Sequence, residues 1–66
     1  MKIKDAWVGQ LRVMVETDDG RSWRSLATYR DEGAVLSAVL VVLKERTRDR
    51  DFNQDGWEPV KEEIWS

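Results

Sequence analysis

The chain has 66 residues, of which 36% are charged, so we expect one small domain over residues 1–66. It contains no cysteine and no histidine, which excludes disulfides, thiolate zinc sites and hydrolases that rely on a histidine base. The net charge of −2 does not indicate a broad basic surface for nucleic acid.

Apolar and polar side chains alternate with a period of two from Lys4 to Thr17. This alternation is typical of a strand with one buried face, so the sequence predicts a single strand over these residues. Trp7 falls on the predicted inner face, as does Trp23 in the segment that follows. We therefore expect both tryptophans to lie in the core, with Gly9 leaving room for an aromatic neighbour.

The stretch Thr17-Asp18-Asp19-Gly20 has the composition of a hairpin loop. Gly20 can take the left-handed backbone conformation that closes a three-residue loop. In the resulting register Val15 lies opposite Trp23, and a second strand runs from Arg21 to Thr28. A two-residue loop is the alternative, and it would shift every cross-strand pair by one residue.

A helix is predicted from the N-cap Asp31 onward, because Asp accepts from the first backbone N–H groups and an acidic first turn suits the helix dipole. At about 100° per residue, seven apolar side chains of this helix cover an arc of roughly 200°, wider than one sheet requires: Val35, Leu36, Ala38, Val39, Leu40, Val42 and Leu43. The excess comes from Leu36 and Leu40, with Val41 isolated on the polar side. We expect another surface to cover that excess.

The segment Asp49–Gly56 is polar, and Trp57–Trp65 has the pattern of a last strand. Pro59 lacks a backbone donor, so this strand is expected at an edge of the sheet. The predicted fold class is α+β with the order ββαβ, a three-stranded antiparallel sheet with one helix packed on one face. The longest apolar run, Ala38–Leu43, is too short for a membrane span, and we expect a cytoplasmic protein.

Residues 51–62, DFNQDGWEPVKE, match the spacing of a helix-loop calcium site. In that interpretation the oxygen ligands come from Asp51, Asn53, Asp55, Trp57 and Glu62. Glu58 stands where such loops carry an apolar residue, Pro59 follows it, and the chain after Glu62 is too short for an exit helix. We therefore prefer a loop that returns the helix to a strand, with calcium as the alternative and no other cofactor expected.

The pattern N-x-x-G-W-E-x-V follows the predicted helix and consists of Asn53, Gly56, Trp57, Glu58 and Val60. It resembles the end of a widespread family of small uncharacterised bacterial domains. In that family the glycine releases the chain from the helix, and the Trp-Glu-x-Val strand returns along the sheet. The resemblance implies this local fold and lends no function.

The arginines on or beside the predicted hairpin are Arg12, Arg21, Arg24 and Arg30. With Trp23 or Tyr29 they could form a sheet surface that binds nucleic acid. The stretch W-R-S-L-A-T-Y before the helix is similar to the strand–helix junction of integrase arm-binding and plant-type AP2 domains, although Ala27 replaces their usual glycine. Acidic neighbours and the acidic net charge make nucleic acid the alternative hypothesis.

No catalytic residue set is present, because the serines have no base nearby in the sequence pattern. We expect a non-enzymatic module that binds another protein, or a second copy of itself. The expected contact residues are Leu36, Leu40, Val41 and Trp65, and a basic partner would be steered by Glu58, Glu62 and Glu63. The ββαβ order with a closing G-W-E-x-V strand is similar to small phage proteins, which implies an inhibitor or regulator of a host enzyme or defence complex.

Overall fold

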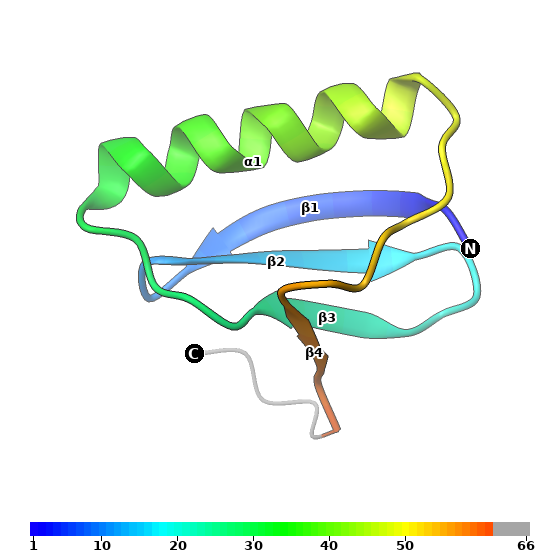
Figure 1. Cartoon of the computed structure of the whole chain (residues 1–66), viewed down its shortest axis with the longest axis horizontal. Helices are drawn as coiled ribbons and strands as arrows, with labels where there is room; N and C mark the ends of the chain where they lie inside the picture. Colours follow the sequence, from blue (N-terminus) through cyan, green and yellow to red (C-terminus); the bar gives the residue numbers. More distant parts are fainter. Residues whose placement is uncertain (62–66) are drawn as a thin grey trace.

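The computed structural model describes residues 1–61, which form an antiparallel sheet and one helix (Figure 1). The strands are β1 (Ile3–Gly9), β2 (Arg12–Thr17), β3 (Ser22–Ser25) and β4 (Trp57–Pro59), and the helix is α1 (Glu32–Thr47). The strands lie in the order β1-β2-β3-β4. The α+β class with one helix is as predicted, but the sheet in this part of the chain has four strands instead of three.

The additional strand arises from a tight turn at Gln10-Leu11, inside the segment predicted as one strand. The two residues have φ angles of 51° and 62°, and Gly9 pairs with Arg12 across them. A two-residue turn with both φ angles positive is type I′, whose twist suits an antiparallel hairpin. Such turns favour Asn and Gly, so Gln-Leu gave no signal. The prediction of a single strand over residues 4–17 is therefore wrong.

The turn also changes the face on which Trp7 lies. Trp7 pairs with Met14, whereas Ala6 pairs with Val15, which is fully buried in the core with residues of α1. Directly paired residues share a face of the sheet, so Trp7 lies on the face away from α1. The prediction that Trp7 shares the core with Trp23 is wrong, while Trp23 itself is buried as predicted.

The loop between β2 and β3 has the predicted form. Gly20 has a φ of 85°, and its N–H donates to the Thr17 carbonyl at 3.0 Å. Val15 pairs with Trp23, which confirms the register of the three-residue loop. β3 ends at Ser25, earlier than the predicted end at Thr28.

The helix begins at the predicted cap and packs through a valine face. Asp31 Oδ1 accepts the N–H of Ala34 at 2.8 Å. Val35 and Val39 are buried, and α1 lies over β1 and β2 (Figure 1). Together with the helix valines, the core consists of Ile3, Val13, Val15 and Trp23. No helix within residues 1–61 is long and apolar enough to cross a membrane.

The sheet near β3 is covered by the segment that follows the helix. The ring centroid of Phe52 lies 5.7 Å from that of Trp23 and 5.3 Å from that of Trp57. The N–H of Phe52 donates to the Met1 carbonyl at 2.6 Å. Trp57 pairs with Ser25, which confirms that this segment returns the helix to the sheet. The polar composition of residues 49–56 gave no signal for this role of Phe52.

Both edges of the sheet carry features that oppose the addition of another strand. On β1 the Lys4 carbonyl accepts from Arg46 Nη1 at 3.1 Å, and the Ala6 N–H donates to Asp5 Oδ1 at 2.8 Å. On β4 Pro59 has no N–H to donate. Because a further strand binds to free N–H and C=O groups, these positions are closed to it.

Candidate functional site

The outer face of α1 carries three large apolar side chains that the core does not use. Leu36, Leu40 and Val41 are 51%, 59% and 60% exposed. Residues four apart on a helix are neighbours, so Leu36 and Leu40 lie on consecutive turns. Their exposure agrees with the wide apolar arc seen in the sequence, and their role in binding stays a prediction.

Leu36 continues this apolar surface toward the first hairpin. With Leu36, a hollow on that flank of the helix is lined by Val8, Gly9, Gln10, Leu11, Glu32 and Val35. Val8 and Leu11 are partly exposed, and the Leu11 carbonyl is fixed by the N–H of Tyr29 at 2.8 Å. This part of the surface was not predicted, because Val8 and Leu11 were expected within one long strand.

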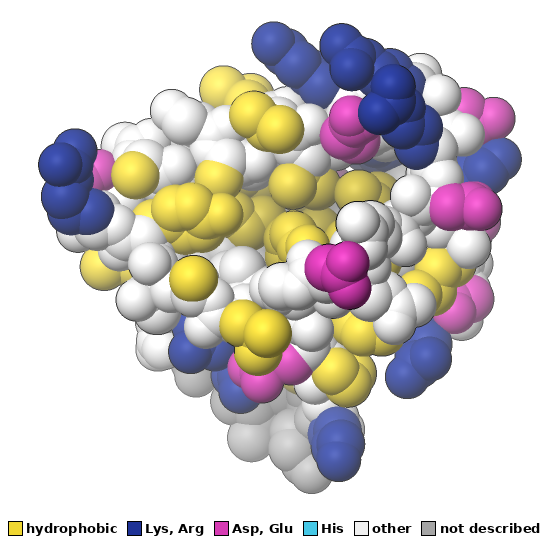
Figure 2. All heavy atoms as spheres, in the orientation of Figure 1, with side chains coloured by type: hydrophobic (Ala, Val, Ile, Leu, Met, Phe, Trp, Pro, Cys, Tyr) yellow, Lys and Arg dark blue, Asp and Glu magenta, His cyan; other side chains and the backbone are white. Residues whose placement is uncertain are grey.

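Val41 borders a second hollow, on the other flank of α1. This hollow has a volume of about 360 Å³ and is lined by Ile3, Val41, Val42, Glu45, Arg50, Asp51, Phe52, Asn53 and Trp57. Figure 2 shows apolar side chains gathered between the helix and the strands on this face. Glu45 lies 3.4 Å from Arg50, and Asp51 lies 3.7 Å from the N-terminal ammonium group. The charged lining residues are therefore neutralised within the chain.

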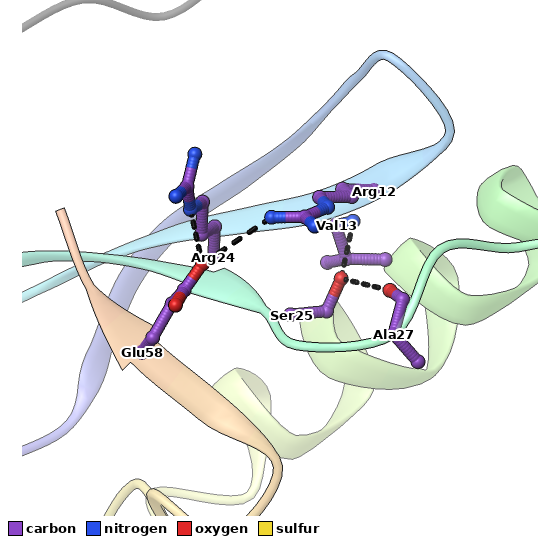
Figure 3. A network of polar contacts seen from close by, with 6 residues as sticks. All are labelled: Arg12, Val13, Arg24, Ser25, Ala27 and Glu58. Carbon is purple, nitrogen blue, oxygen red and sulfur yellow. Dashed lines mark hydrogen bonds and ion pairs between the residues drawn. The ribbon is translucent and has the colours of Figure 1, made fainter.

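Glu58, which was expected to steer a basic partner, lies between two arginines. Its Oε1 accepts from Arg24 Nε and lies 3.3 Å from Arg12 Nη1 (Figure 3). Glu58 pairs with Arg24, and Arg24 pairs with Met14, which places this cluster on the sheet face away from α1. Its carboxylate is therefore neutralised locally. The other expected steering and anchor residues lie outside the described residues: Glu62, Glu63 and Trp65.

The buried hydroxyl of Ser25 has a structural role beside this cluster. Its Oγ accepts the N–H of Val13 at 3.1 Å and donates to the Ala27 carbonyl at 3.0 Å (Figure 3). Both contacts are to backbone groups, so the hydroxyl joins β2 and the end of β3.

The arginines of the nucleic-acid alternative do not share one surface. Arg12 and Arg24 converge on Glu58. The guanidinium carbon of Arg21 lies 5.0 Å from the ring centroid of Trp23, which belongs to the core under the helix. Arg30 precedes the helix and lies 3.3 Å from Asp31. Each arginine therefore has a partner within the chain.

The residues of the calcium alternative make contacts within their own loop and with the N-terminus. Asn53 Oδ1 accepts the N–H of Asp55 at 3.0 Å, and the N–H of Trp57 donates to the Gln54 carbonyl at 3.0 Å. Asp51 pairs with the N-terminal ammonium group. Among residues 1–61 no group of three or more His, Cys, Asp or Glu could hold a metal ion. Glu62 lies outside that range, so calcium binding stays a prediction.

In comparisons with known proteins, no family model, no curated protein and no solved structure matches this chain. The likenesses to small bacterial domains and to phage inhibitors gain no support from them. Of the expected contact residues, Leu36 and Leu40 lie four residues apart on one side of α1, and Val41 lines the hollow on its other flank. Glu58 lies on the opposite side of the sheet. The outer face of α1 is therefore the candidate site.

Proposed function

We propose that this chain is a non-enzymatic module that binds another protein through the outer face of α1. The observation that supports the proposal is the exposure of Leu36, Leu40 and Val41, each more than half exposed. Leu36 and Leu40 are neighbours on consecutive turns, and exposed apolar surface that extends over several residues marks interaction sites on soluble proteins. An apolar arc wider than one sheet can cover is typical of a helix that packs against a further surface.

More specifically, we propose that the module regulates or inhibits a larger enzyme or defence complex. A domain of 66 residues with one apolar helix face is suited to occupying a groove on a larger protein. The nucleic-acid alternative has weaker support, because Glu58 neutralises part of the positive charge of Arg12 and Arg24.

A pull-down from a lysate of the source cells tests the proposal, with wild type compared with Leu40→Glu and Gln54→Glu. Gln54 is exposed in the loop before β4, so its variant adds the same charge away from α1. Circular dichroism first establishes that all three chains fold. We expect a protein that wild type and Gln54→Glu capture and Leu40→Glu loses. Capture that is equal for all three chains contradicts the proposal, and so does a wild-type chain that captures nothing and does not associate with itself.

A further inference from the structure

We propose that a second copy of this chain occupies the outer face of α1, in an antiparallel pairing of the two helices. The inference rests on the proposed function, because it names the partner of the same surface. The contact row consists of Glu32, Leu36, Leu40 and Lys44, all of which are exposed.

These four residues form one ridge along the helix, because residues four apart lie on a continuous row. The centre of the ridge is apolar, its first residue is acidic and its last residue is basic. The neighbouring row begins with Gly33 and Ser37, whose small side chains allow another helix to approach closely. The outer face therefore has the shape that ridge-into-groove packing of two helices requires.

The charges at the ends of the ridge have no partner within the described chain. Of the charged residues in α1, Glu45 lies 3.8 Å from Arg48 and 3.4 Å from Arg50, and Arg46 donates to the Lys4 carbonyl. No ion pair joins Glu32 or Lys44 to any other residue in the range 1–61. The two lie about 18 Å apart along the helix axis, so they cannot pair within one copy.

An antiparallel arrangement brings these two charges together between copies. Residues 36 and 40 are centred on position 38 of the helix, and so are residues 32 and 44. A twofold axis at this position packs Leu36 against Leu40 of the partner subunit and places Glu32 beside Lys44 of the partner subunit. The axis repeats each contact, so two leucine contacts lie between two ion pairs. Opposed helix dipoles also favour this orientation.

The charge pattern favours a second copy over an unrelated protein as the occupant. An unrelated partner must supply an acidic and a basic group on either side of an apolar centre, and this chain supplies both. One helix pair is a small interface, so we expect a Kd on the order of tens of micromolar.

Sedimentation equilibrium from about 5 µM to about 1 mM tests the pairing over a range that brackets this Kd. The wild-type mass is expected to rise from 7.7 kDa toward twice that value. Leu40→Glu is expected to raise the Kd at least about 30-fold, as loss of a central apolar contact does. Glu32→Lys and Lys44→Glu are each expected to raise it about 3- to 10-fold through like-charge contacts.

The double variant Glu32→Lys with Lys44→Glu is the decisive sample. It restores opposite charges between residue 32 of one copy and residue 44 of the other, and it does so only if the two helices pair about the twofold axis. Its Kd is expected to return to within about threefold of wild type, as the coupling of contacting residues requires. Circular dichroism of each chain controls for changes in the helix itself. Single variants without effect, or a double variant as weak as the singles, overturn the proposed pairing.

Failure of this inference and failure of the proposed function give different results. Wild type that remains monomeric to about 1 mM, far above the expected Kd, overturns the second copy as the partner. A captured protein that Leu40→Glu loses then still supports the proposed function. A monomer that also captures nothing contradicts both proposals.

Discussion

The inner and outer faces of α1 are both apolar but have different surroundings. Val35 and Val39, on the inner face, are 2% and 7% exposed, whereas Leu36 and Leu40 are more than half exposed. The inner face uses short, stiff valines that fit against a pleated sheet. The outer face uses longer leucines that the fold does not need for its core. Apolar composition alone therefore does not distinguish a residue that stabilises the fold from one that is available for binding.

The largest effect is expected from alanine at Val35, and the neighbouring Leu36→Ala is its matched control. Loss of two buried methyl groups from Val35 should lower the free energy of unfolding by about 2 kcal/mol. Leu36→Ala in the monomer should change it by less than about 0.5 kcal/mol. Urea denaturation at low protein concentration measures both. Equal losses would show that the outer face also belongs to the core.

A smaller effect on the free energy of unfolding is expected at the start of α1. Both faces depend on this position alike, because both belong to the same helix. Asp31→Ala removes the acceptor for the Ala34 N–H and should lower the free energy of unfolding by about 1 kcal/mol. Asp31→Asn keeps a good cap and serves as the control. Thermal unfolding by circular dichroism gives the comparison. If Asp31→Ala equals Asp31→Asn, this hydrogen bond does not determine where α1 begins.

The smallest effect is expected in the loop between β2 and β3, remote from both faces of the helix. The hydrogen bond from the Thr17 hydroxyl to Asp19 lowers the pKa of that carboxyl below its usual 3.8. A lowered folded-state pKa stabilises the fold above the unfolded pKa, and this contribution is lost as the pH falls through the folded pKa. An NMR titration of Asp19 should show the low pKa in wild type and a higher one in Thr17→Val.

This loop also provides a control for the comparison of the two helix faces. Protonation of Asp19 should reduce the stability of the Val35→Ala and Leu36→Ala chains alike, because the sites are separate. Urea denaturation on both sides of the Asp19 transition tests this. If the difference in unfolding free energy between the two variants changes when Asp19 is protonated, the loop and the helix are coupled.

Features set by local chemistry could be predicted from the sequence. Asp31 marked the start of the helix because a carboxylate accepts unpaired N–H groups at that position. Gly20 marked the second loop because a left-handed residue closes it. The wide apolar arc indicated that Leu36 and Leu40 extend beyond the face that the sheet covers, because the width of the arc follows directly from helical spacing.

Features that depend on particular turns or distant contacts could not be predicted. The turn at Gln10-Leu11 lacks the usual Asn or Gly, and an alternating pattern continues on both sides of it. Phe52 stands in a polar segment, and its role depends on rings from β3 and β4. Glu58 meets Arg24, 34 residues earlier in the chain, so its neutralised charge follows from strand pairing alone.

The closed edges of the sheet have a consequence for the solubility of the chain. Open strand edges allow copies to add without limit, which is how sheet proteins grow into fibrils. Here Arg46 and Asp5 occupy positions on one edge, and Pro59 interrupts the other. The proposed helix pairing would use the same patch on both copies and would be complete at two chains. Concentrated samples are therefore not expected to form amyloid-like fibrils.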